Sequence, residues 1–266
     1  MMKPTKRALM IGAAALVTCG SVLPAFAQDN IGDVRHPLWY EAPSERTLEL
    51  AKIDDLSETV VSQGPRGEDG VLYTEIGLTD EQIEKVRAGN FTAAISMGWL
   101  GDDWATQQLI GLKETFENLN IEVVAETNAN WEDARQISDL DAISVLEPDL
   151  LVSIPLNTAT TANAYQKLAD NGTKIVFIDQ AADDMQPGED YVSVISSDNL
   201  ALGMYLADLL SDAIGGEGDV AAMYYAPDFH VTNLRYIGFI ARLIAKYPDI
   251  NLVASVAQSA VDVSVA

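Results

Sequence analysis

Acidic and aromatic side chains gather directly after the first apolar segment of the chain. The stretch Gly98-Trp99-Leu100-Gly101-Asp102-Asp103-Trp104 holds two carboxylates and two tryptophans. Carboxylates accept hydrogen bonds from neighbouring hydroxyls, and an indole face stacks on the apolar C–H face of a sugar ring. This combination of side chains therefore predicts a sugar site in this stretch. The purely structural interpretation is that Asp103 caps the next helix and Trp104 packs in the core.

Two later places in the chain offer further polar candidates. Asp179 and Gln180 directly follow an apolar run that ends at Ile178. The alternative interpretation is that a lone Asp at such a position is only a turn or cap residue. Asn233 and Arg235 lie at the start of a predicted helix, and Arg offers several fixed donors to a hydroxyl-rich ligand. These residue types predict a site for a polar small molecule.

Catalytic and metal-binding templates are largely absent. After position 27 the histidines are His36 and His230, neither in a metal-binding motif, and Cys19 is the only cysteine of the chain. The sequence also lacks a G-x-S-x-G motif and a phosphate-binding glycine loop. We expect no catalytic residue, no metal and no cofactor. An enzyme would have to use carboxylates alone, as glycosidases do.

The elements that must position these candidates follow from hydrophobic periodicity. Short apolar runs are typical of strands buried on both faces of a parallel sheet, and ligands bind beyond the carboxyl ends of such strands. The predicted strands are Thr92 to Met97, Ile121 to Ala125, Leu150 to Ile154, Lys174 to Ile178, Tyr191 to Ile195, Asp219 to Tyr225 and Asn251 to Val256.

Helical patterns lie between these strands. A helix from Asn199 to Ile214 should end at Gly215 through a glycine cap. Spacings of three and four residues place four apolar side chains on one face of each of two further helices. The first set is Leu109, Leu112, Phe116 and Leu119, and the second is Leu234, Ile237, Ala241 and Ile244. Repeated strand-helix-strand units predict an α/β fold with a doubly wound parallel sheet.

Composition excludes several classes of protein. The 266 residues are 48% hydrophobic, which excludes intrinsic disorder as the main state. Three of the 16 basic residues lie in the first 27 positions, which hold no acid, so the remainder carries 13 basic against 40 acidic residues, a formal charge of −27. Such a charge repels nucleic acids and anionic membranes. We therefore expect no nucleic-acid partner.

Residues 1–27 have the pattern of a secretory signal peptide. A basic start precedes an apolar run from Ala8 to Val17, and Ala25-Phe26-Ala27 matches the site of signal-peptide cleavage. We expect cleavage after Ala27 and a periplasmic protein; a membrane anchor or a lipoprotein lipidated at Cys19 are the alternatives. The expected organisation continues with an N-terminal extension at 28–90, including a capped helix from Thr79 to Ala88, and lobes at 91–198 and 199–266.

Three ordered motifs resemble the type I periplasmic solute-binding proteins of sugar transporters, the ribose-binding-protein-like family. Phe177-Ile178-Asp179-Gln180 resembles the family's apolar-apolar-Asp-Arg turn, and Val194 to Asn199 resembles its crossover between lobes. Asn233-Leu234-Arg235 with Gly238-Phe239 resembles its Arg-x-x-Gly-Phe signature. The resemblance spans about Phe91 to Val256 and implies the type I periplasmic binding protein fold, with the first lobe complete and the second partial.

The resemblance also implies roles for particular residues of the first lobe. Asp179 would accept hydrogen bonds from ring hydroxyls, Trp104 would be a stacking aromatic, and Asp102 would be a polar contact. Gln180 departs from the family's usual Arg, which leaves the identity of the sugar open.

In the second lobe and the crossover, the resemblance implies further roles. Asn233 and Arg235 would contact the ligand, with Arg235 as a donor, and Ser197 and Asp198 would form one hinge strand. Family members continue through the rest of the second lobe, so we expect this chain to be truncated there, with exposed strand edges and an uncovered helix face.

The function implied is capture of a monosaccharide or polyol and its delivery to the membrane permease of an ABC importer. A chemoreceptor or sensor-kinase ectodomain is a further partner that the same fold serves. The main alternative is an exported carbohydrate-active enzyme that uses Asp102, Asp103 or Asp179. A cytoplasmic repressor of this fold is contradicted by the signal peptide and by the lack of a basic helix-turn-helix module.

Overall fold

The computed structural model describes residues 43–225 and 229–258. The expected signal peptide at 1–27, its cleavage site after Ala27, Cys19 and His36 lie outside the described residues. The described part forms two compact units. Residues 63–197 make up one, here the five-stranded unit, and residues 43–62 with 198–258 make up the other, here the two-stranded unit.

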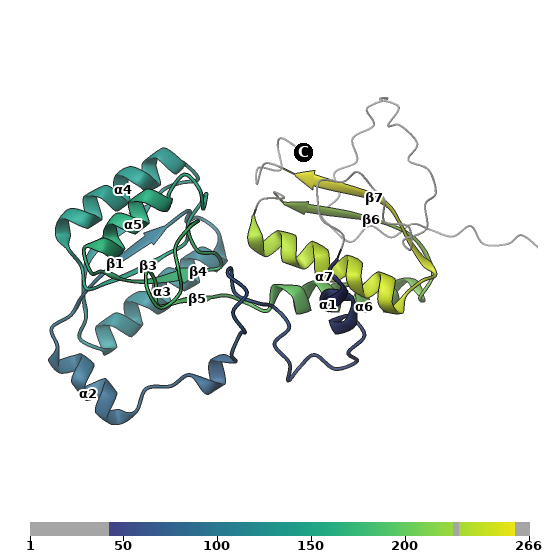
Figure 1. Cartoon of the computed structure of the whole chain (residues 1–266), viewed down its shortest axis with the longest axis horizontal. Helices are drawn as coiled ribbons and strands as arrows, with labels where there is room; N and C mark the ends of the chain where they lie inside the picture. The colour runs from purple at the N-terminus through teal and green to yellow at the C-terminus, as the bar shows by residue number, and fades with distance from the viewer. Residues whose placement is uncertain (1–42, 226–228, 259–266) are drawn as a thin grey trace, which may run out of the picture. The chain divides into compact units, whose positions relative to one another are not determined.

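The five-stranded unit is a parallel sheet in the order β2-β1-β3-β4-β5. Helices α4 and α5 cover one face and α3 covers the other (Figure 1). The strands are β1 (Thr92–Met97), β2 (Glu122–Asn128), β3 (Leu150–Ser153), β4 (Lys174–Ile178) and β5 (Ser193–Ile195); the helices are α3 (Asp103–Asn118), α4 (Asp133–Leu146) and α5 (Ala162–Asp170). The predicted doubly wound α/β fold is confirmed.

The core of this unit lies between the sheet and helices α4 and α5. Tyr165 of α5, Phe177 of β4 and Tyr191 meet in edge-to-face pairs with ring centroids 5.0 and 5.4 Å apart. The buried Tyr165 hydroxyl forms a 2.6 Å hydrogen bond with Ser153 Oγ, which also donates to the Ser96 carbonyl. Burial raises the pKa of Tyr165. These contacts fix β3 against its neighbours just before the strands end.

The two-stranded unit pairs β6 (Gly218–Tyr225) with β7 (Ile250–Gln258) in parallel, beside α6 (Asn199–Ile214) and α7 (His230–Lys246). Figure 1 shows both long helices on the same face of these strands. Gly203 and Gly238 lie where α6 and α7 cross, and a Cβ on either would come within 2.0 to 2.1 Å of a backbone oxygen of the other helix. The glycines therefore let the two backbones approach closely.

The N-terminal segment is divided between the units. Residues 43–62, with helix α1 (Glu45–Leu50), pack on α6 and α7 through Ala51, Leu56 and Val61. Residues 63–90 belong to the five-stranded unit and hold the short 3-10 helix η1 (Tyr73–Glu75) and α2 (Asp80–Ala88). The predicted capping box at Thr79 is present, with Gln82 as its partner.

Element boundaries differ from the predictions mainly where a strand meets a loop. The limits of β1, β4 and α6 agree with the sequence pattern, whereas β2 extends to Asn128 and Tyr191 precedes β5. In the described part of the chain, no helix is both long and apolar enough to cross a membrane.

Candidate functional site

Three tryptophans stack at the carboxyl edge of the five-stranded sheet. Trp99 follows β1, Trp104 lies in the first turn of α3, and Trp131 follows β2. The Trp99 ring centroid is 5.7 Å from that of Trp104 and 4.3 Å from that of Trp131, with interplanar angles of 19° and 15°. Trp99 is 9% exposed, whereas Trp104 and Trp131 are 42% and 39% exposed. The edge therefore carries an accessible aromatic surface backed by a buried indole.

Asp102 joins this stack to helix α3. One carboxylate oxygen accepts a 2.7 Å hydrogen bond from the Trp99 indole N–H, and the other accepts a 2.7 Å bond from the Ala105 backbone N–H. Asp102 is therefore the N-cap of α3, and Asp103 is the first helical residue. The structural interpretation that Asp103 caps this helix and Trp104 packs in the core is wrong on both points, since the half-exposed Trp104 lies outside the buried core.

Asp179 lies at the same edge, immediately after β4. Its φ of 66° is in the left-handed region, which non-glycine residues rarely occupy. The Ser196 hydroxyl, after β5, donates to the Asp179 carboxylate over 2.8 Å, and the Asp179 N–H donates to the Ile195 carbonyl over 2.9 Å. The half-buried carboxylate is thus held at the carboxyl end of the sheet, where strained backbone often marks a functional site.

Gln180 is buried, with 3% of its surface exposed. Its side-chain amide donates to the Pro155 carbonyl over 2.7 Å, which ties the turn after β4 to the loop after β3. Its buried Oε1 has no hydrogen-bond partner among the described residues.

Asn233 and Arg235 lie on α7 of the two-stranded unit. The exposed Arg235 donates through Nε to Asn199 Oδ1 over 2.8 Å. The buried Oδ1 of Asn233 has no partner among the described residues. Asn199 is the first residue of α6, so Arg235 links the second turn of α7 to the start of α6.

The crossover residues Ser197 and Asp198 occupy the boundary between the units. Ser197 is the last residue of the five-stranded unit, and Asp198 is the first residue of the returning segment and the N-cap of α6. The Asp198 carboxylate accepts from the backbone N–H groups of Val61, Ser62 and Ala201. It therefore binds the N-terminal segment to the start of α6.

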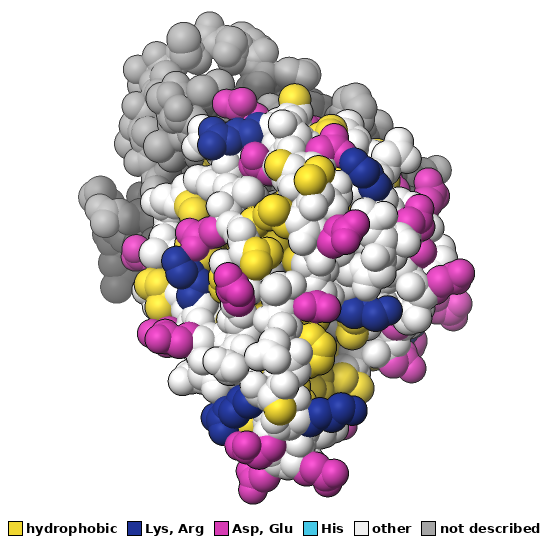
Figure 2. Space-filling view, turned by 90° about the vertical axis from the view of Figure 1, so that its left-hand side faces the viewer, with side chains coloured by type: hydrophobic (Ala, Val, Ile, Leu, Met, Phe, Trp, Pro, Cys, Tyr) yellow, Lys and Arg dark blue, Asp and Glu magenta, His cyan; other side chains and the backbone are white. Residues whose placement is uncertain are grey.

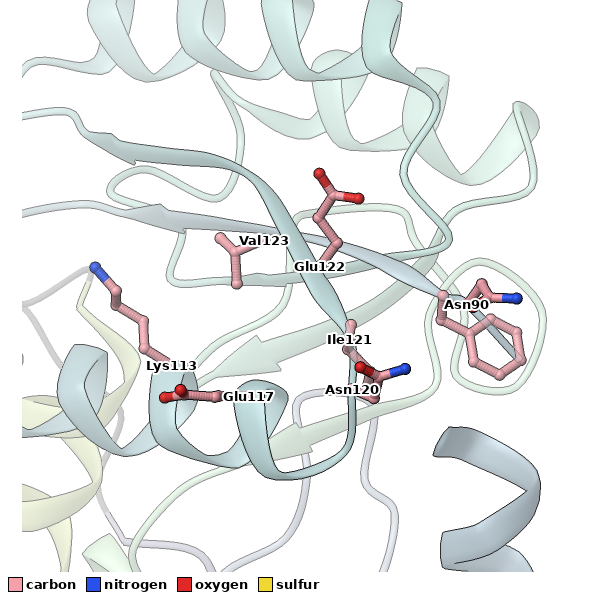
Figure 3. Close-up of a pocket in the computed structure, with 8 residues that line it drawn as sticks. Asn90, Lys113, Glu117, Asn120, Ile121, Glu122 and Val123 are labelled. Atoms are coloured by element: carbon pink, nitrogen blue, oxygen red, sulfur yellow. The ribbon is translucent and has the colours of Figure 1, made fainter. Parts of the chain in front are cut away.

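A separate hollow of about 500 Å³ lies at the opposite edge of the sheet, where strands begin. Figure 3 shows Lys113 and Glu117 on α3 and Asn120 to Val123 where the chain turns from α3 into β2. Parallel sheets bind ligands at the carboxyl edge, so this hollow is on the wrong side for the predicted site.

Figure 2 shows both acidic and basic side chains on one face of the molecule. Acidic side chains are spread over the face shown in Figure 2, and the basic side chains lie apart from one another. Among residues 43–225 and 229–258, no three His, Cys, Asp or Glu side chains cluster as metal ligands would.

Sequence reasoning missed Trp131 and the role of Ser196. Asn130 and Trp131 both adopt left-handed φ values, 53° and 65°, which turn the chain after β2. The available signal was an aromatic residue shortly after a strand, but the predicted strand ended at Ala125, whereas β2 continues to Asn128. Because the predicted strand was too short, the sequence did not place Trp131 at the carboxyl edge of the sheet.

Comparisons with known proteins agree with this architecture. A family model described as a periplasmic binding protein domain matches residues 93–266. A search of curated proteins found no match. Among solved structures, the sugar-binding protein of a sugar ABC transporter from Bacillus halodurans is 24% identical with a TM-score of 0.56, and the match covers 63% of this chain and 56% of that one.

Two further solved structures carry a named ligand. A carbohydrate-transporter solute-binding protein from Agrobacterium radiobacter, in complex with D-arabinose, is 24% identical over 63% of this chain and 57% of that one, with a TM-score of 0.56. A Caulobacter myo-inositol-binding protein with bound myo-inositol is 20% identical over 64% of this chain and 56% of that one, with a TM-score of 0.55.

These likenesses show the fold, and the chain spans little more than half the length of the structures it matches. The family match covers more than half of the chain and includes all the strands of both α/β units. This chain therefore belongs to the periplasmic binding protein domain family and has the type I periplasmic binding protein fold.

Proposed function

We propose that this protein is the solute-binding component of an ABC importer and that it captures a monosaccharide or cyclic polyol at the carboxyl edge of the five-stranded unit. The observation that carries the proposal is the combination of a half-exposed indole, Trp104, with the edge carboxylate of Asp179. A sugar presents an apolar C–H face for the indole and hydroxyls for the carboxylate.

The backbone at this edge supports the same interpretation. Asp179 is held in a left-handed conformation, and its N–H and one carboxylate oxygen are anchored to the end of β5. An anchored carboxylate loses little conformational freedom when a ligand hydroxyl donates to it, which favours binding. We assign Asp179 as an acceptor for ring hydroxyls and Trp104 as the stacking residue.

Further parts of the proposal rest on the family resemblance. Asn233 and Arg235 are proposed ligand contacts, and Ser197 with Asp198 is proposed as one connecting segment of a hinge. A signal peptide cleaved after Ala27 would deliver the protein to the periplasm, and a membrane permease would receive the solute. The named structural neighbours are solute-binding proteins, which supports a binding role rather than catalysis.

Calorimetric titration of the chain with D-arabinose, D-allose, D-tagatose and myo-inositol tests this function. We expect saturable binding of at least one of these compounds. Asp179→Asn should weaken it by about tenfold to a hundredfold, since a hydrogen bond to a charged group contributes roughly 1.5–3 kcal/mol.

Asp184→Asn is the matched control. Asp184 is an exposed carboxylate with φ 63°, so both substitutions place Asn in the left-handed region and remove one charge. Binding should be unchanged in this control. Equal effects of the two variants would contradict a specific role for Asp179, and no binding of any of the four compounds would contradict the proposed ligand class.

A further inference from the structure

The three-tryptophan stack is supported by two residues that need not touch a ligand. We propose that Asp102 and Trp131 are positioning residues that hold the Trp99 indole, and through it the exposed face of Trp104, in a preformed stacking platform. This inference rests on the proposed function for its ligand, but the arrangement of the platform can be measured without one.

Both carboxylate oxygens of Asp102 accept hydrogen bonds that shape the platform. Its two oxygens accept from the Trp99 indole and from the Ala105 backbone, each over 2.7 Å. Hydrogen bonds to a charged acceptor are roughly twice as strong as neutral ones. One carboxylate therefore fixes both the plane of Trp99 and the first turn of the helix that carries Trp104.

Trp131 supports Trp99 from the neighbouring strand. Its ring centroid lies 4.3 Å from that of Trp99, closer than the 5.7 Å between Trp99 and Trp104. Asn130 and Trp131 are consecutive residues with left-handed backbone, and this turn brings Trp131 to Trp99. The Trp131 N–H donates to the Gly98 carbonyl over 3.0 Å. Left-handed backbone is unfavourable for a bulky residue such as Trp131, so surrounding contacts must hold it.

The consequence for binding is preorganisation. A half-exposed indole on a mobile side chain would lose rotamer freedom when a sugar stacks on it. Trp104 instead lies against Trp99, which is 9% exposed and held by Asp102 and Trp131. The ordering of the aromatic surface is thus completed by folding rather than by the ligand.

The test compares Asp102→Asn with Asp103→Asn. Asn is as good an N-cap as Asp, so Asp102→Asn retains an acceptor for Ala105 but lacks a second carboxylate oxygen for the Trp99 indole. Asp103→Asn makes the same charge change one residue along the chain. Exciton-coupled circular dichroism reports the mutual orientation of the indoles, and calorimetry with D-arabinose reports binding.

We expect Asp102→Asn to reduce the exciton signal and to weaken D-arabinose binding about tenfold, while Asp103→Asn changes neither. Trp99→Phe removes the indole donor but keeps an aromatic ring. Because Asp102 would act through that donor, the double variant Asp102→Asn/Trp99→Phe should bind no more weakly than Trp99→Phe.

An unchanged exciton signal in Asp102→Asn overturns the proposal, as does a reduced signal with unchanged D-arabinose binding. Trp131→Phe should likewise weaken binding, and equal affinity would remove Trp131 from the proposal. If the unmodified chain binds no D-arabinose, the proposed function fails for this sugar, and the exciton signal alone then decides whether Asp102 holds Trp99.

Discussion

The Ser62 hydroxyl donates a 2.6 Å hydrogen bond to the Asp198 carboxylate, although 136 positions separate the two residues in the sequence. The backbone N–H groups of Val61 and Ser62 donate to the same carboxylate over 2.7 and 3.1 Å. The Leu200 N–H in turn donates to Ser62 Oγ over 3.0 Å. The chain thus leaves the two-stranded unit after Ser62 and re-enters it at Asp198 beside the same carboxylate.

Ser62→Ala should loosen the N-terminal segment from the start of α6. The substitution removes one donor to Asp198 and the acceptor for Leu200, at an expected cost of about 1–3 kcal/mol. Hydrogen exchange should become faster at Val61, Ser62 and Leu200. Ser57→Ala is the control, because Ser57 is an exposed serine of the same segment. Unchanged exchange at Leu200 in Ser62→Ala would contradict the role given to Ser62.

Acid should release the same segment from α7. Arg242, which is 1% exposed, binds Asp208 through two 2.7 Å hydrogen bonds and donates to the Ala51 and Ile53 carbonyls. Burial by itself raises the pKa of Asp208, but hydrogen bonds from Arg242 and Tyr247 and the Arg242 charge outweigh it and lower the pKa below its ordinary value of 3.8.

Since the folded pKa of Asp208 is below the unfolded one, its contribution to stability is complete above about pH 4 and is lost as the pH falls through the folded value. The protection factors of the amides at residues 51–54, which remove the intrinsic pH dependence of hydrogen exchange, should fall from pH 6 to pH 2. Asp208→Asn should show faster exchange already at pH 6 and a weaker dependence on pH. An identical pH dependence in that variant would rule out Asp208 as the titrating group.

Gly238→Ala should destabilise the crossing of α6 and α7. A Cβ at this position would lie 2.1 Å from the Leu200 carbonyl oxygen, so a helix must shift, which costs roughly 1–3 kcal/mol or more. Gly111→Ala on α3 is the control, since its Cβ would meet nothing within 4 Å. That variant should gain about 0.5–1 kcal/mol from helix propensity. Urea unfolding measures both changes, and a neutral Gly238→Ala would contradict the close approach.

Leucines on the exposed side of α6 should promote self-association of this chain. Leu202, Leu206 and Leu209 are 44%, 48% and 66% exposed. The double variant Leu202→Glu/Leu209→Glu should lower the average mass in light scattering and change stability by no more than about 0.5 kcal/mol per site. Leu200→Glu, at a residue 4% exposed, should instead unfold the helix pair. Unchanged scattering would mean that this face does not drive association.

The sequence alone was sufficient for the elements whose signals are local. The limits of β1, β4 and α6 and the capping box at Thr79 agree with prediction, because an apolar run, a glycine cap or a capping residue acts within a few positions. The order of those elements also predicted the doubly wound parallel sheet and its functional edge, since right-handed crossovers leave few alternatives.

Only the tertiary structure decided which distant residues meet. Trp131 joins Trp99 because two left-handed residues turn the chain after β2, and residues 43–62 pack on α6 and α7 through contacts more than a hundred positions apart. Such contacts leave no periodic trace in the sequence, because each depends on backbone turns and packing rather than on neighbouring residue types.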